Sequence, residues 1–162
     1  MAKVILICGK ICSGKTCYAK GLIKETNAVL LSSDELISAL FHPNENEYHN
    51  QIIDNVQKFL MNKSVELVNA GLTVILDWGF WTKESRTAVS DFYKSNGIEF
   101  EWHYIDIDNE QWQKNIDSRN NAVLKNETTD YYVDSGLLQK CNIMFEVPEN
   151  NEIDVGDNLN AK

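Results

Sequence analysis

The chain has 162 residues, 43% of them hydrophobic, which suits a single domain with a buried core. Its formal net charge of −9 and the absence of any run of lysines and arginines argue against tight binding of DNA or RNA, so we do not expect such a partner. No apolar run approaches the ~20 residues of a membrane span, and no signal-peptide pattern is recognisable, so we expect a cytoplasmic protein without a membrane partner.

The first elements are a strand followed by a phosphate-binding loop. Residues 4–8 form a short, β-branched apolar run typical of a buried parallel strand. The following segment fits G-x-x-x-x-G-K-[ST] at every required position and leads into a helix expected at 16–25. Its residues are Gly9, Lys10, Ile11, Cys12, Ser13, Gly14, Lys15 and Thr16.

The spacing of this motif has a chemical reason. The glycines let the chain curl so that successive backbone N–H groups face phosphate oxygens. The helix that starts near Lys15 adds the positive end of its dipole. The Lys15 ammonium can reach the β and γ phosphates, and the Thr16 hydroxyl can ligate magnesium. The loop therefore predicts binding of ATP with Mg²⁺.

Strand and helix patterns alternate along the rest of the chain. Short apolar runs predict strands at 28–31, 73–76, 100–107 and, as a last edge strand, 152–155. Helices are expected at 33–41, with Ser33 or Asp34 as the cap, and at 52–68, 83–95 and 109–124. A polar excursion occupies 42–50, and 131–145 has a mixed pattern.

This alternation predicts an α/β fold around a parallel sheet. In such folds ligands bind at the carboxyl ends of the strands. Gly9, the Ser33–Asp34 pair, Asp77 and Asp106 all fall at such ends, so we expect the functional site there.

The order of these pieces resembles a family. The loop, then LSSDEL at 31–36, VILD at 74–77 and a polar, Arg-bearing helix resemble the P-loop kinases related to polynucleotide kinase, gluconate kinase and chloramphenicol phosphotransferase. The resemblance covers about 4–121. It implies a three-layer P-loop NTPase sandwich, with a mostly parallel five-stranded sheet and a small helical lid at about 109–135. We expect one such domain over 1–162.

The resemblance assigns roles to two carboxylates. Asp34 matches the residue that accepts the proton of the acceptor hydroxyl, although an Asp there can also simply cap the helix behind it. Asp77 matches a carboxylate near magnesium or the acceptor, and its alternative is a solvated Asp at a strand end.

A third role falls on the polar helix. Arg119 matches a lid arginine that clamps the transferring phosphoryl group, and its alternative is an exposed surface cation. Gln111, Asn115 and Arg119 are spaced by four residues, so one helix face can present all three to phosphate. Arg86, the other arginine of the chain, is expected only to pair with a nearby acid.

Two departures from the family concern the acceptor. Polynucleotide kinases usually carry an Arg three residues after the catalytic Asp, and this position is Ile37. The lid position that is often a second Arg is Asn115. Both changes remove contacts to a phosphorylated or polymeric acceptor, so a small, neutral acceptor is expected.

Aromatic residues follow Asp77 and the lid. Trp78 and Trp81 can stack on a ring of the acceptor, or they can fill the core under a helix. The segment 131–134 can close the same pocket, but packing is the simpler role.

Three functions remain open at this point. The leading prediction is an ATP-dependent kinase that phosphorylates a hydroxyl of a small, ring-bearing molecule. The alternatives are a nucleic-acid 5′-hydroxyl kinase and a nucleotide-binding ATPase or regulatory module without acceptor. The acceptor, the choice between ATP and GTP, and the oligomeric state are not determined by the sequence.

Overall fold

A computed structural model describes residues 1–40, 49–128 and 130–158. Within these ranges five parallel strands form one sheet in the order β2-β3-β1-β4-β5. The strands are β1 (Val4–Cys8), β2 (Val29–Ser32), β3 (Val74–Asp77), β4 (Phe100–Asp106) and β5 (Val155–Asn158). The predicted α/β fold with a five-stranded sheet is confirmed.

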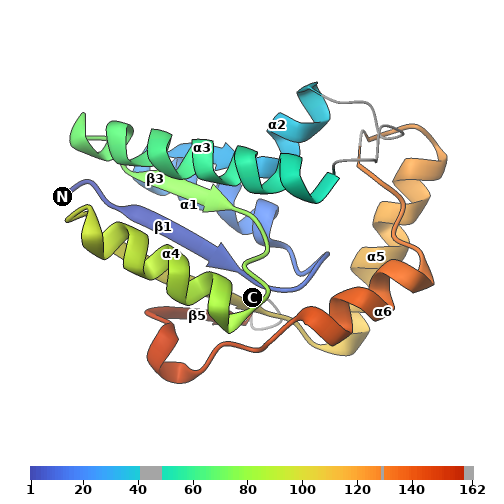
Figure 1. Cartoon of the computed structure of the whole chain (residues 1–162). Helices are drawn as coiled ribbons and strands as arrows, with labels where there is room; N and C mark the ends of the chain where they lie inside the picture. Colours follow the sequence, from blue (N-terminus) through green and yellow to red (C-terminus); the bar gives the residue numbers. More distant parts are fainter. Residues whose placement is uncertain (41–48, 129, 159–162) are drawn as a thin grey trace.

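Helices cover both faces of this sheet and its carboxyl edge. They are α1 (Lys15–Thr26), α2 (Ser33–Leu40), α3 (His49–Asn69), α4 (Lys83–Ser95), α5 (Asn109–Leu124) and α6 (Ser135–Met144), with a 3₁₀ turn η1 (Asn150–Glu152). Figure 1 shows α5 and α6 gathered at the end toward which the strands point. None of the helices in the described ranges combines the length and the apolar character of a membrane span.

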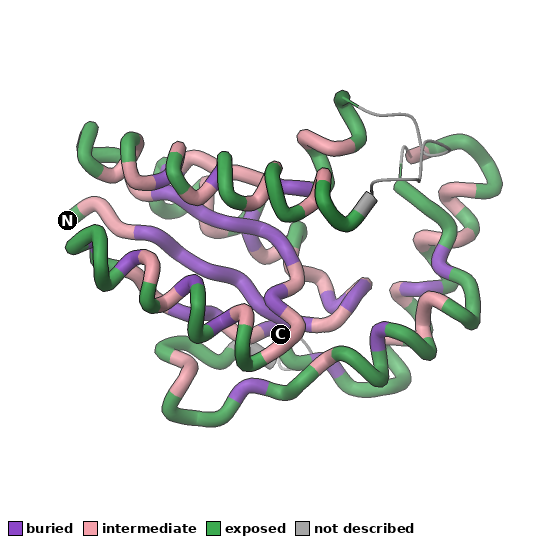
Figure 2. Tube along the Cα trace, in the orientation of Figure 1, coloured by how far each residue is buried: buried purple, intermediate pink, exposed green. Residues whose placement is uncertain are grey.

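The strands build two apolar layers because successive side chains point to opposite faces. On one face Val4, Leu6 and Leu76 pack with residues of α3 and α4 such as Leu60 and Tyr93. On the other face, a second set packs against α1, consisting of Ile5, Ile7, Ile75 and Ile105 with Ala19. The central strands β1 and β3 are accordingly buried, while much of the surrounding helical surface is exposed (Figure 2).

The register of the strands brings the loops that follow them together. Asp77, the last residue of β3, pairs with Ile7 of β1 on one side and with Ser32 of β2 on the other. The phosphate loop, the start of α2 and Asp77 therefore lie at one edge of the sheet.

Some predicted boundaries differ from the structure. The mixed pattern at 131–145 contains the helix α6, and the predicted excursion at 42–50 lies outside the described residues except for its last two, which belong to α3. The strand predicted at 152–155 is wrong at both ends, since β5 runs over Val155–Asn158 and shares only Val155 with it. Asp154 explains the later start, because its carboxylate rather than a backbone carbonyl accepts the Trp102 N–H, at 2.8 Å.

Candidate active site

The phosphate loop depends on two glycines. A Cβ at Gly9 would lie 2.8 Å from Ser13 Oγ and 2.9 Å from the Ile105 carbonyl oxygen, so only glycine fits. Gly14 has a φ of 95° and precedes the first turn of α1 without supplying a side-chain cap. The N–H groups of that turn are thus left for a ligand. Ser13 Oγ, buried in the loop, has no hydrogen-bond partner among the described residues.

The side chain of Lys15 folds back onto the start of the phosphate loop. Its ammonium donates hydrogen bonds to the carbonyl oxygens of Gly9 and Lys10, at 2.9 and 2.8 Å. Desolvation lowers the pKa of Lys15, while the carboxylates of Asp77 and Asp34 act in the opposite direction. The cation is therefore held at the loop within the field of both predicted site carboxylates.

Thr16 and Asp77 meet directly. The Thr16 hydroxyl donates a hydrogen bond of 2.8 Å to Asp77 Oδ2, and Asp77 is only 5% exposed. A hydroxyl and a carboxylate oxygen are ligands that Mg²⁺ accepts, and this ion keeps several waters rather than requiring a full protein cage. This donor set fits magnesium, although the described residues contain no cluster of three or more His, Cys, Asp or Glu side chains that would hold a metal by themselves.

Asp34 lies in the first turn of α2, at the same edge of the sheet. The predicted capping role of Ser33 or Asp34 is wrong, because the Ser32 hydroxyl accepts the Glu35 N–H, at 3.3 Å. The residue keeps an exposed surface, yet the atoms around its carboxyl group desolvate it and raise its pKa, and the charge of Asp77 raises it further. Lys15 and Arg119 oppose this shift, so both cations act on the Asp34 carboxylate.

The helix α5 docks on the outside of the phosphate loop. Trp112 Nε1 donates to the Ile11 carbonyl at 2.6 Å, and Asn115 Nδ2 donates to the Cys12 carbonyl at 2.9 Å. Ile116 packs with Ile11 in an apolar cluster that also contains residues of α6. The helix α5, predicted as part of a lid, is thus attached to the tip of the loop.

Arg119 reaches the loop from the same helix. Its Nη1 lies 3.8 Å from Cys12 Sγ, and its Nε donates to the Tyr131 carbonyl at 3.2 Å. Gln111, in contrast, donates to Asn115 Oδ1 at 2.9 Å, so the face that meets the loop is built from 112, 115 and 119. Sequence reasoning missed Trp112, although a large aromatic residue on a polar helix was a usable signal.

This combination of strand, loop and docked helix can be compared with known proteins. A family model described as AAA domain matches residues 4–135. The chain belongs to this AAA domain family. A search of the curated proteins found no significant match.

Solved structures share the fold over almost the whole chain. A sugar kinase from Janibacter sp. is 15% identical with a TM-score of 0.67, covering 99% of this chain and 87% of the other. APS kinase from Mycobacterium tuberculosis, in complex with AMPPNP and APS, is 18% identical with a TM-score of 0.64, covering 98% and 88%. A gluconokinase from Sinorhizobium meliloti is 14% identical with a TM-score of 0.63, covering 97% and 82%. The predicted P-loop kinase fold is confirmed.

The two tryptophans after β3, predicted to stack on an acceptor or to fill the core, both pack against apolar clusters of the protein. Trp78 continues the alternation of Val74 and Leu76, so its ring enters the core. The residue is 6% exposed, and the centre of its ring lies 5.0 Å from the centre of the Phe80 ring. This burial argues against Trp78 as a stacking surface for an acceptor. Trp81 is half-buried beside the apolar cluster under α5 and α6, and its indole leaves no room for a Cβ at Gly79.

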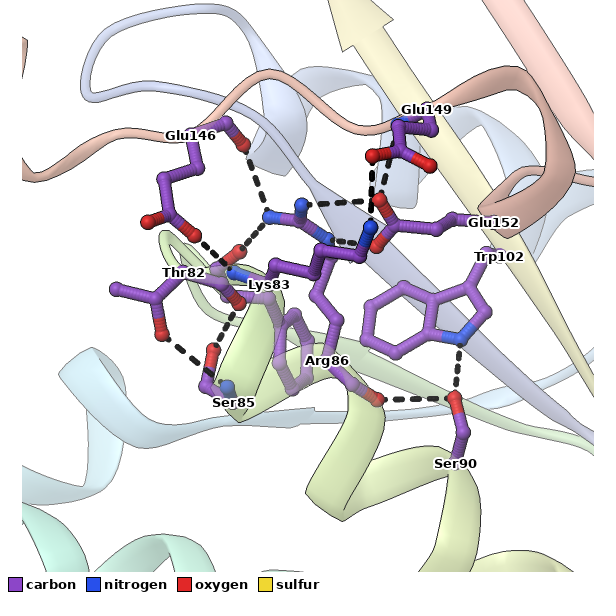
Figure 3. A network of polar contacts seen from close by, with 10 residues as sticks. Thr82, Lys83, Ser85, Arg86, Ser90, Trp102, Glu146, Glu149 and Glu152 are labelled. Atoms are coloured by element: carbon purple, nitrogen blue, oxygen red, sulfur yellow. Dashed lines mark hydrogen bonds and ion pairs between the residues drawn. The ribbon is translucent and has the colours of Figure 1, made fainter.

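Arg86 is a structural residue, as its predicted pairing with an acid implied. It is 2% exposed, its Nε donates to Glu152 at 2.8 Å, and its Nη1 donates to the carbonyl oxygens of Phe80 and Glu146 (Figure 3). The network joins α4 to residues 146–152, beside an open groove of about 830 Å³ whose lining includes Lys83 and Glu149. These two charges pair with each other at 2.7 Å.

Proposed function

We propose that this protein transfers the γ-phosphoryl group of ATP to a hydroxyl of a small, neutral acceptor. The observation that carries this proposal is the position of Asp34. Its carboxylate lies in the field of Lys15 and Arg119 at the carboxyl edge of the sheet, and its pKa is raised. A base whose pKa is closer to neutrality accepts a proton more readily at physiological pH than an ordinary Asp does.

Each neighbouring residue supplies one requirement of phosphoryl transfer. The N–H groups at the start of α1 and the Lys15 ammonium would bind the β and γ phosphates. Thr16 and Asp77 would hold Mg²⁺, which when bound neutralises charge on the phosphate oxygens. Arg119, attached to the loop through Cys12, would stabilise charge on the transferring group.

Asp34 would complete the reaction on the acceptor side. Its carboxylate orients the acceptor hydroxyl and takes its proton as the bond from the acceptor oxygen to the γ-phosphorus forms. The bond between that phosphorus and the ADP oxygen breaks, and the electron pair leaves with ADP. Since the transition state of such transfers is loose, positioning contributes more than the basicity of Asp34.

The charges around Asp34 support a neutral acceptor. Asn115, at the position where the resemblance predicts a second lid arginine, donates its amide to the loop at Cys12 and brings no charge. Asp34 itself experiences the further negative charges of Asp77 and Asp130. Once phosphates engage Lys15 and Arg119, this acidic surrounding favours a neutral acceptor over an anionic one. The names of the structural neighbours, sugar kinase and gluconokinase, also support a small molecule.

An assay of ADP release across acceptors tests this proposal. The panel contains neutral sugars and polyols, aromatic alcohols, sugar acids and 5′-hydroxyl oligonucleotides, each with ATP and Mg²⁺. We expect a neutral small molecule to stimulate ADP release. Stimulation by oligonucleotides alone would identify a nucleic-acid kinase. ADP release at the same rate with and without every acceptor would identify an ATPase.

A further inference from the structure

The segment that follows α5 is fixed against that helix. The side-chain amide of Asn120 accepts the Val133 N–H at 2.8 Å and donates to the Val133 carbonyl at 2.9 Å. Val133 is 2% exposed within the apolar cluster beside Ile11, and Asp134 caps α6 through the Leu137 N–H at 2.7 Å. The chain around 131–134 is thus held in one conformation next to the phosphate loop.

Tyr131, in this fixed segment, contacts the Arg119 side chain in two ways. The guanidinium carbon lies 4.3 Å from the centre of the Tyr131 ring, and Nε donates to the Tyr131 carbonyl at 3.2 Å. The same side chain reaches Cys12 Sγ at 3.8 Å. A long arginine side chain has many rotamers, so a ring face and a carbonyl that already hold it reduce the entropy lost when it binds a phosphoryl group.

Asp130 contributes less to this arrangement. Its Oδ1 lies 3.8 Å from Arg119 Nη2, and its side chain is 56% exposed. Exposed ion pairs at such distances contribute little, because water and salt screen the two charges. The ring and the carbonyl of Tyr131 are therefore the main determinants of where the guanidinium lies.

The charge of Asp34 acts on the hydroxyl of Tyr131. Tyr131 is 46% exposed, yet the atoms around its hydroxyl desolvate it and raise its pKa to about 12, and the charge of Asp34 contributes to this rise. The phenol consequently stays protonated and neutral at physiological pH. Tyr131 thus lies within the field of Asp34 while its ring covers Arg119.

We propose that Tyr131 is a positioning residue that presents the Arg119 guanidinium to the transferring phosphoryl group. This inference rests on the proposed function, since it gives Arg119 its place in that reaction. The ring is the part of Tyr131 that matters, because it sets the plane of the guanidinium; the hydroxyl is secondary. Tyr131→Phe should then preserve the effect, and Tyr131→Leu should remove it.

The two arginines of the chain make a direct test feasible. With ¹⁵N-labelled arginine, the correlation spectrum of the Nε–Hε groups contains one signal from Arg119 and one from Arg86. Arg86, buried in its ion pair with Glu152, serves as the internal reference. Arg119→Lys assigns the other signal. Tyr132→Leu is the matched control, because Tyr132 is 49% exposed and Tyr131 46% exposed.

We expect Tyr131→Leu to shift the Arg119 Hε signal and to accelerate its exchange with water. Tyr131→Phe and Tyr132→Leu should leave both properties close to those of the parent. In the acceptor-dependent assay, Tyr131→Leu should lower kcat about 3- to 30-fold with little change in the KM for ATP, the range expected for a lost cation–π contact. Combined with Arg119→Ala, it should add no further loss.

Several outcomes would overturn the inference. An Arg119 signal unchanged in Tyr131→Leu would show that the ring does not hold the guanidinium. A changed signal with an unchanged kcat, or losses that add in the double variant, would show that the contact plays no part in the reaction. If the parent shows no acceptor-dependent turnover, the proposed function fails and the inference fails with it, even where the spectra confirm the contact.

Discussion

The Thr16 hydroxyl lies 2.8 Å from the Asp77 carboxylate, although 61 residues separate them in the sequence. Thr16 belongs to the first turn of α1, and Asp77 is the last residue of the neighbouring strand β3. The contact joins the phosphate loop to the end of a second strand. In the proposed function these two oxygens would hold a magnesium ion bound to the phosphates.

Asp77→Asn should weaken nucleotide binding only when magnesium is present. The amide keeps the shape and can still accept the Thr16 hydrogen bond, but it lacks the negative charge that would hold the ion. Calorimetry with AMPPNP should show a loss of about 10-fold or more with Mg²⁺ and little change with EDTA. Equal losses in both conditions would mean that Asp77 only supports the loop.

Lys15→Ala should keep the fold and lose most of the affinity for ATP. The substitution removes the cation that would face the β and γ phosphates, together with the hydrogen bonds to Gly9 and Lys10. Thermal unfolding followed by circular dichroism provides the folding control, and calorimetry with magnesium provides the affinity. Equal affinity in parent and variant would exclude a phosphate contact for Lys15.

On acidification the turnover should fall, and the midpoint of this fall should lie at a higher pH than the pKa of an ordinary aspartate. Desolvation, followed by the charge of Asp77, raises the pKa of Asp34 above its ordinary value of 3.8, so the base form is lost earlier on acidification. A rate-against-pH profile at saturating ATP measures this limb. A limb with its midpoint at or below the ordinary value would contradict the role assigned to Asp34.

The same shift has a consequence for stability. Because the pKa of Asp34 is raised in the folded state, the ionised carboxylate destabilises the fold above that pKa, and this penalty is absent below the unfolded value. Asp34→Asn removes this ionised group, so urea unfolding at neutral pH should show a variant that is no less stable than the parent. A clear loss of stability in Asp34→Asn would contradict the raised pKa.

Hydrogen exchange in α5 should slow when AMPPNP and magnesium bind. Trp112 and Asn115 already attach this helix to the loop, so a ligand in the loop stabilises both together. Arg119→Ala should at the same time lower the maximal rate far more than it weakens ATP binding. The exchange of α4 serves as the control. Unchanged exchange in α5 with a normal rate for Arg119→Ala would make this helix a static outer layer.

The sequence was sufficient for the parts of the site that are contiguous or that end a strand. The phosphate loop is one uninterrupted motif, and its backbone geometry follows from Gly9 and Gly14. Asp77 could be placed beside it because the carboxyl ends of parallel strands lie at the same edge. The pairing of Arg86 with an acid was also foreseeable, though not its partner Glu152, which comes from a distant turn.

The contacts of the aromatic residues could not be predicted, because they depend on how loops and helix faces pack against one another. The alternation that buries Trp78 extends one residue beyond β3, which a pattern ending at Asp77 does not reveal. Tyr131 precedes α6 in a segment without periodicity, so its contact with Arg119 could not be deduced. Trp112 was overlooked because the bond to Ile11 depends on the angle at which α5 approaches the loop.

The most direct test of the central claim is the fate of the γ-phosphoryl group. ATP labelled in that group is incubated with Mg²⁺, the protein and the acceptor that most stimulates ADP release, and label on the acceptor and in inorganic phosphate is measured separately. We predict that most of the label appears on the acceptor, and that Asp34→Asn lowers this transfer by roughly 10²-fold or more while ATP affinity stays within a few-fold of the parent. Label that appears in inorganic phosphate alone, at the same rate in parent and Asp34→Asn, would contradict the assignment of a kinase.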